Sequence, residues 1–182
     1  MRRLSPRYLW PLALVLAPGC RQPESSTSDD PLFAFDADQV MVGLQHVLTS
    51  DGVRIARLRA DTAYFYSARS EIDLRGLELD FFDPSGLVQS VLRARSGVYN
   101  PATGDMRAHG AVEVRDASRD RRLETEDLRY DAGQDQLIGT SPFVFYRGGT
   151  TTRGSSFEAD PAMDNVRTTQ SSMVAPGVTI PQ

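Results

Sequence analysis

The chain has 182 residues, of which 40% are hydrophobic and 24% are charged, and its formal net charge is −4. This length suits one domain with short extensions. The composition is too apolar for a disordered chain and too polar for a multi-span membrane protein. Every basic residue is an arginine, and the arginines form no basic block, so nucleic acid is not expected as a partner. The lack of lysine also excludes a P-loop nucleotide site from this chain.

The first 19 residues have the layout of a lipoprotein signal peptide. Met1–Arg7 carry three arginines and no acid, Tyr8–Leu16 are mainly apolar, and small residues at 17–19 precede Cys20, the single cysteine. The apolar run is about half as long as the roughly 20 residues that span a membrane. The layout as a whole therefore predicts cleavage of segment 1–19 and lipidation of Cys20. Residues 20–38 are polar and rich in serine, which is typical of a flexible tether.

Apolar and polar residues alternate with a period of two beyond residue 39. The alternation is clearest in Leu77–Phe81 and Val112–Arg115, and it is the pattern of strands with one buried face. Clusters of Gly, Pro, Asp and Asn, such as Asp83–Gly86 and Asn100–Gly104, separate these runs and favour turns. We therefore predict an all-β domain over residues 39–172, with strands of about five to eight residues, and a C-terminal tail at 173–182.

The strand and turn segments also repeat along the chain. Tyr99 and Tyr130 lie 31 residues apart in similar surroundings, and segments 60–65 and 156–165 supply an earlier and a later copy. A repeat of about 30 residues cannot bury its own apolar face, so neighbouring repeats must stack. Stacking predicts an elongated β structure in which two facing sheets enclose the apolar side chains. If the sheets splay, the enclosed space becomes a groove.

Three segments carry a resemblance to a known family. They read GVYNPATGDM at 97–106, HGAVEV at 109–114 and LETEDLRYD at 123–131, and they resemble the repeat shared by the LptC and LptA proteins of lipopolysaccharide export. The membrane-attached N-terminus and the opening VMVGL at 40–44 are features that favour LptC over LptA.

The resemblance implies an elongated open β-jellyroll of stacked antiparallel strand repeats whose apolar interior holds the acyl chains of lipopolysaccharide. It further implies that the protein accepts lipopolysaccharide from an inner-membrane ABC transporter. The cargo would then pass to an LptA-like periplasmic β-jellyroll, which docks through edge-strand pairing. This function is non-enzymatic and uses no cofactor. The expected location is the periplasmic side of the inner membrane, with lipidated Cys20 in place of the transmembrane helix of the best-known members.

The alternating apolar side chains are the candidate lining of the lipid groove. Burying each CH₂ group of an acyl chain is worth about 0.8 kcal/mol, so an apolar lining would shield the cargo from water. Alternation alone favours a closed, dry core, and the family resemblance is the reason to expect a partly open groove. The candidates are Leu58, Leu77, Leu79, Phe81, Leu92, Val112, Val114, Leu128, Tyr130, Phe143 and Phe145.

Two alternatives come from other classes of protein: a structural β-repeat envelope lipoprotein with a closed core and no lipid cargo, and an envelope hydrolase on a β scaffold. A hydrolase of the paired-carboxylate kind needs two acids in one cleft. The recurring aspartates are instead expected near turns, which they help to form. They are Asp61, Asp105, Asp131 and Asp135. The histidines, His46 and His109, lie in different repeats without a metal-ligand spacing, so no metal site is expected.

Overall fold

The structure is a computed structural model that describes residues 37–169 and 171–174 of the chain. The expected signal peptide, Cys20, the tether up to residue 36 and residues 175–182 lie outside the described residues. The described ranges form 12 β-strands and no helix. In this part of the chain there is accordingly no helix long and apolar enough to cross a membrane. The predicted all-β class is confirmed.

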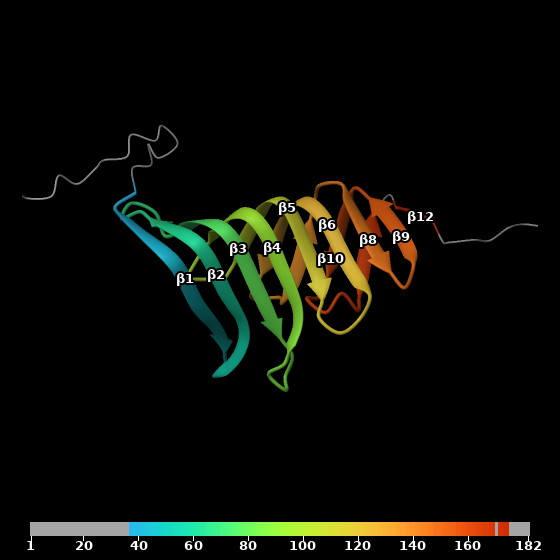
Figure 1. The fold of residues 1–182 in the computed structure, drawn as a ribbon, viewed down its shortest axis with the longest axis horizontal. Coiled ribbons are helices and arrows are strands. Elements are labelled where there is room, and N and C mark those ends of the chain that lie inside the picture. The colour runs from blue at the N-terminus through green and yellow to red at the C-terminus, as the bar shows by residue number, and fades with distance from the viewer. Residues whose placement is uncertain (1–36, 170, 175–182) are drawn as a thin grey trace, which may run out of the picture. The chain divides into compact units, whose positions relative to one another are not determined.

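The strands pair with one another in antiparallel fashion throughout, and Figure 1 shows them side by side along the long axis. β1 starts at residue 39, the predicted start of the domain, and β12 ends two residues beyond its predicted end. The strands are β1 Gln39–Ser50, β2 Val53–Phe65, β3 Ile72–Phe82, β4 Val88–Tyr99, β5 Met106–Asp116, β6 Arg121–Asp131, β7 Gln136–Gly139, β8 Phe143–Arg147, β9 Thr150–Gly154, β10 Ser156–Ala159, β11 Val166–Thr169 and β12 Ser172–Val174.

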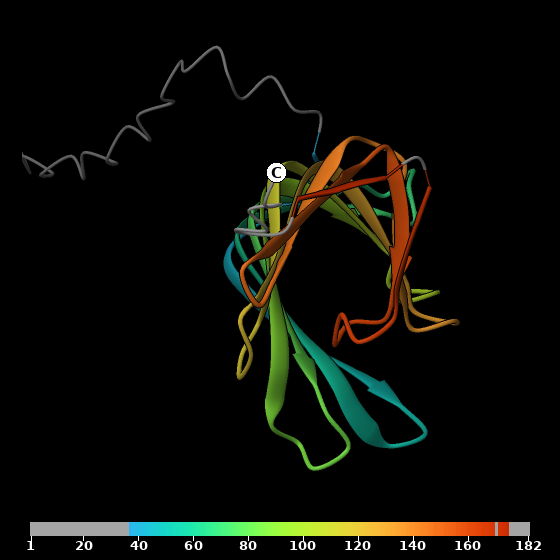
Figure 2. The same cartoon turned by 90° about the vertical axis from the view of Figure 1, so that its right-hand side faces the viewer.

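The strands form one 12-stranded sheet that is folded into two facing layers. β1 to β6 pair in sequence order, and β6 then pairs with two strands, Arg121–Thr125 with β8 and Arg129–Asp131 with β7. β9 and β12 continue the sheet from β8, whereas β10 and β11 continue it from β7. Figure 2, which looks along the stack, shows the strands curving around a common interior. The two facing sheets that the sequence predicts are therefore two halves of one sheet.

We call the two halves layer A and layer B. Layer A consists of residues 44–50, 53–60, 77–82, 88–94, 112–116 and 121–125 together with β8, β9 and β12. Layer B consists of residues 39–42, 62–65, 72–75, 96–99, 106–109 and 127–131 together with β7, β10 and β11.

Each of the strands β1 to β6 bends where it passes from one layer to the other, and we call this line of bends the corner. Four corner residues have a left-handed backbone, with φ between 49° and 82°: Gly43, Gly76, Gly110 and Ala111. Glycine at three of these positions fits, because it adopts positive φ without a steric cost. β1 to β6 are 11 to 13 residues long. The prediction of five to eight residues is wrong for them, because each long strand serves both layers.

The hydrophobic core lies between the layers, and the corner changes which residues of a strand face it. In β3 the last buried side chain of layer B is Leu74 and the first of layer A is Leu77, with Gly76 between them. The step across the corner is thus three residues instead of two. β2 and β6 show the same step between buried residues, at 60–63 and 125–128. In these three strands the inward-facing positions therefore change from odd to even, or the reverse, whereas β5 keeps even-numbered positions inward along its whole length.

Candidate functional site

All eleven candidate groove residues lie in one apolar cluster between the layers. Each of these side chains is at most 5% exposed. The larger part comes from layer A: Leu58, Leu77, Leu79, Phe81, Leu92, Val112, Val114, Phe143 and Phe145. Leu128 and Tyr130 come from layer B. The structure brings the predicted set together, and its role as a groove lining stays a prediction.

Sequence reasoning missed much of the layer B side of this interior. The further buried residues of layer B are Ala63, Leu74, Tyr99, Met106, Ala108, Leu137, Phe157 and Ala159. In β3 the signal is the glycine in the middle of the strand, Gly76, because an isolated strand glycine often marks a bulge or a sharp bend. Beyond Gly76 the alternation has to be counted afresh, whereas Met106 and Ala108 of β5 keep the period of Val112 and Val114.

Side chains from the two layers meet and fill the interior. The rings of Phe81 and Tyr130 are 4.9 Å apart between centroids at 67°, and those of Phe143 and Phe157 are 5.1 Å apart at 63°. These are edge-to-face contacts, which aromatic pairs prefer. A Cβ atom on Gly139 would lie 2.1 Å from the Phe157 ring, so the packing there leaves no spare room. An acyl chain could enter this region only if the layers moved apart or the side chains repacked.

Three of the aspartates that the sequence singled out help to form turns, as predicted. Asp105 accepts a hydrogen bond from the Ala132 N–H at 3.1 Å, and Asp131 accepts one from the backbone N–H of residue 134 at 3.1 Å. Asp135 accepts a hydrogen bond from the hydroxyl of Tyr130 at 3.0 Å. Burial, and then the charge of Asp135, raise the pKa of Tyr130, which keeps its hydroxyl neutral. These partners give the three carboxylates structural roles and lend no support to a hydrolase.

The fourth aspartate and the two histidines lie elsewhere. Asp61 is in β2 at the corner, where a Cβ on Gly76 would lie 1.9 Å from its carboxylate; its predicted place near a turn is wrong. His109 lies with its Nδ1 atom 2.5 Å from Asp127 on the exposed surface, and His46 contacts the Tyr99 ring. Among the described residues no group of three His, Cys, Asp or Glu is arranged to hold a metal ion.

Ion pairs cover the outer face of layer A. Arg57 donates to Asp80 at 2.6 Å, Arg93 donates to Glu78 at 2.6 Å, and Arg59 bonds both of these acids. These side chains alternate with the inward-facing leucines of β2, β3 and β4, as expected for a sheet with one solvated face. This face is therefore polar, and it does not offer a surface for hydrocarbon.

Exposed apolar surface is found instead on β1, at one end of the sheet. Within the described part of the chain β1 pairs with β2 alone, so its other edge presents unpaired backbone N–H and C=O groups. Val40, Val42 and Val47 on this strand are 54%, 81% and 45% exposed. A long, apolar edge strand is normally protected, and it can accept a strand from another protein. The opposite end of the sheet is formed by β11 and β12.

Comparison with protein families identifies the family to which this architecture belongs. A family model described as "Lipopolysaccharide-assembly, LptC-related" matches residues 34–167, which is more than half of the chain. The chain belongs to this family. The resemblance carried by segments 97–106, 109–114 and 123–131 is thereby confirmed, and membership in the LptC family implies a role in lipopolysaccharide transport by a periplasmic β-jellyroll.

A solved structure shows the same fold. The chain is similar to LptH from Pseudomonas aeruginosa, described as the LptA homologous periplasmic component of the conserved lipopolysaccharide transport device. The TM-score is 0.54 and the sequence identity is 13%, over 67% of this chain and 95% of that chain. At this identity the likeness supports the β-jellyroll fold alone. No curated protein matches the chain.

Proposed function

We propose that this LptC-family protein accepts lipopolysaccharide from an inner-membrane ABC transporter and passes it to a periplasmic β-jellyroll bridge, without catalysing a reaction. One observation carries the proposal. A single cluster of buried apolar side chains extends from Leu48 in β1 to Ala159 in β10. Val166 of β11 packs against this cluster, so the apolar interior runs from the β1 end of the sheet to the β11 end, which is what a path for hydrocarbon requires.

The energetics of acyl-chain entry support such a path. Moving an acyl chain from water into an apolar interior is favourable by about 0.8 kcal/mol for each CH₂ group that is buried. Inside the protein, contacts between the two layers would be exchanged for contacts with the acyl chain, and both kinds of contact are apolar. The hydrophobic free energy therefore changes little in the exchange. The cost that remains is that of separating the layers, and the work of loading would come from the ATPase of the transporter.

The free edges of the sheet are the proposed docking sites. β1, with its exposed valines and unpaired edge, would add to a strand of the transporter. The β11 and β12 end would add to the next β-jellyroll. Such strand addition would join the apolar interiors of successive proteins, since the sheet would continue from one protein to the next.

Membrane attachment is part of the same proposal. Cys20 would carry the lipid anchor in the inner membrane, and residues 20–38 would tether the domain on the periplasmic side. The support is the layout of residues 1–20 alone. Processing that is blocked by globomycin, together with fractionation of the protein with the inner membrane, is the expected result. A protein that stays in the soluble fraction would contradict this anchor.

Site-specific photocrosslinking to radiolabelled lipopolysaccharide tests the transport path. A photoreactive residue at Phe81 or Val114, which face the interior, should label the lipid in cells that export it. Glu113 is the matched control, because it neighbours Val114 but faces outward and pairs with Arg115 at 2.9 Å. Label at Glu113 and not at the two interior positions would exclude the path between the layers.

A second candidate is a structural envelope lipoprotein with a closed core and no cargo. The observation that favours it is the sealing of the interior, since all eleven candidate residues are at most 5% exposed. This candidate predicts that no interior position crosslinks to lipopolysaccharide, whatever the transporter does. The crosslinking experiment at Phe81 and Val114 therefore separates the two functions.

A further inference from the structure

The two sides of the interior differ in how the layers are connected. At the corner the backbones of β1 to β6 run from one layer into the other. On the opposite side the two layers end in separate rows of turns. Layer A ends in turns 51–52, 83–87, 117–120 and 148–149, and layer B ends in turns 66–71, 100–105, 132–135 and 160–165. The layers can separate on this side only if nothing joins the two rows.

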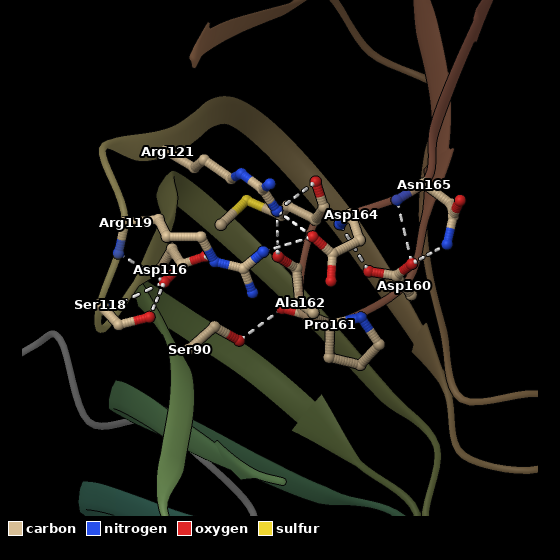
Figure 3. Close-up of polar contacts among 11 residues, drawn as sticks. Ser90, Asp116, Ser118, Arg119, Arg121, Asp160, Pro161, Ala162, Asp164 and Asn165 are labelled. Atoms are coloured by element: carbon tan, nitrogen blue, oxygen red, sulfur yellow. Dashed lines mark hydrogen bonds and ion pairs between the residues drawn. The ribbon is translucent and has the colours of Figure 1, made fainter. Parts of the chain in front are cut away.

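Turn 160–165, between β10 and β11, joins them (Figure 3). The Ser90 hydroxyl, at the layer A end of β4, donates a buried 2.6 Å hydrogen bond to the carbonyl of Pro161. Arg121, the first residue of β6, donates to the carbonyl of Met163 at 3.3 Å. These bonds link positions 71 and 42 residues apart in the sequence, and they cross from one layer to the other.

Charged groups reinforce the crossing. The carboxylate of Asp164 accepts hydrogen bonds from Arg119, at 2.5 Å, and from Arg121. Arg119 also lies 3.1 Å from Asp116, which is almost fully buried at the end of β5. The four groups alternate in charge and neutralise one another. The side chain of Asp164 is 45% exposed, so these ion pairs are weakened by solvent and salt and are readily broken.

The turn is held together by hydrogen bonds of its own. The Asp160 carboxylate accepts hydrogen bonds from the backbone N–H groups of Asp164 and Asn165, at 2.9 and 3.0 Å, and from the side chain of Asn165 at 2.8 Å. Inside the turn, Met163 has a left-handed backbone with φ of 55° and a fully buried side chain. Its thioether chain is inserted in the apolar cluster between the layers.

Other turns of layer B make their bonds within their own layer. In turn 66–71, Tyr66 and Arg69 both donate to Asp73 of β3, at 3.0 and 2.9 Å. In turn 100–105, Asp105 accepts its hydrogen bond from Ala132 of the neighbouring layer B turn. Turn 160–165 differs from these two turns, because its hydrogen bonds to Ser90 and Arg121 reach the other layer.

We propose that residues 160–165 are a latch that holds the two layers closed, and that its release from Ser90, Arg119 and Arg121 opens the interior to an acyl chain. The inference rests on the proposed function, because it takes the acyl chains of lipopolysaccharide as the occupant. When the latch is released, the side chain of Met163 moves out of the core. A segment of hydrocarbon of similar size then fills the space that Met163 occupied. The corner stays intact, so the layers hinge apart without loss of strand pairing.

Amide hydrogen exchange and association kinetics on the full-length protein test the latch. Addition of lipopolysaccharide should speed exchange in residues 160–165. The variant that combines Asp164→Asn with Ser90→Ala removes the ion pairs and the buried hydrogen bond, and it should associate with lipopolysaccharide about 5-fold faster or more. Asp73→Asn is the matched control, because it removes an exposed pair with Arg69 inside layer B, and its association rate should not change.

Crosslinking at Val114 distinguishes failure of the latch from failure of the transport path. Lipid that crosslinks at Val114, with equal association rates for the latch variant and Asp73→Asn and no faster exchange at 160–165, overturns the latch and leaves the transport path standing. No crosslink at Val114 in either the wild type or the latch variant overturns both, since nothing would enter. Faster association of the latch variant, with crosslinking retained, supports both.

Discussion

The two sides of the interior are joined by different means. At the corner, six strands pass from layer A to layer B, so separating the layers there would break the sheet itself. At the latch, the junction consists of a buried hydrogen bond from Ser90, a hydrogen bond from Arg121 to the carbonyl of Met163, and the ion pairs of the half-exposed Asp164. A sheet that is continuous along one side and latched along the other can open without unfolding. A conveyor of large lipids needs this combination, because its interior must be both water-shielded and accessible.

The largest effect on stability is expected from the contacts between the layers. Phe81→Ala removes a fully buried ring that packs on Tyr130, and we expect a loss of about 3–5 kcal/mol in the free energy of unfolding. Phe82→Ala is the control, because the neighbouring ring faces outward under Arg54, and it should cost about 1 kcal/mol or less. Urea denaturation measures both. Equal losses would mean that the layers do not pack on each other.

The corner supplies the next largest effect. Gly76→Val puts a branched side chain on a backbone with φ of 62° and a Cβ 1.9 Å from the carboxylate of Asp61. We expect a loss of about 2–3 kcal/mol in the free energy of unfolding.

Gly43→Val separates the two causes of this loss. Gly43 has φ of 69° at the same corner, and a Cβ there would meet nothing within 4 Å. Its substitution should cost only the backbone part, about 1–2 kcal/mol. Thermal or urea unfolding measures both variants. If Gly76→Val lowered the free energy of unfolding no more than Gly43→Val does, the clash with Asp61 would not contribute to the loss.

These glycines also mark what the sequence could and could not predict. The alternation in Leu77–Phe81 and Val112–Arg115 predicted the all-β class and the layer A residues of the core, because within one layer the period of two holds. The corner breaks that period in β3, where the inward side shifts by one residue at Gly76. A constant alternation therefore misses Leu74, and strand lengths predicted from turn residues alone come out too short.

The latch was beyond reach of sequence patterns for another reason. Asp160, Asp164 and Asn165 look like ordinary turn residues, and most of their bonds within the turn fit that interpretation. The contacts that matter run to Ser90 and Arg121, 71 and 43 residues away. Only the folding of the sheet onto itself brings these positions together, and no local pattern encodes the pairing.

Acid should loosen the latch and leave the corner unchanged. Hydrogen bonds from Arg121 and Arg119 hold the pKa of Asp164 below its ordinary value. A lowered carboxyl pKa contributes stability above the unfolded pKa of about 4, and this contribution is lost as the pH falls through the folded value. The difference in melting temperature between wild type and Asp164→Asn should therefore be constant above about pH 5 and shrink below about pH 4. A difference that persists unchanged at pH 3 would show that the charge of Asp164 does not hold the latch.

The smallest effect on stability is expected at the β1 edge, where the effect on binding should be large. Val42→Lys combined with Val47→Lys changes two exposed side chains, so the free energy of unfolding should stay within about 0.5 kcal/mol. Lysines on an edge strand oppose strand addition, and co-purification with the transporter should fall. Leu87→Lys is the control, because Leu87 is 68% exposed in the β3–β4 turn, away from the edge. Transporter binding that survives the β1 substitutions would move the docking site away from β1 and leave the interior, corner and latch as they are.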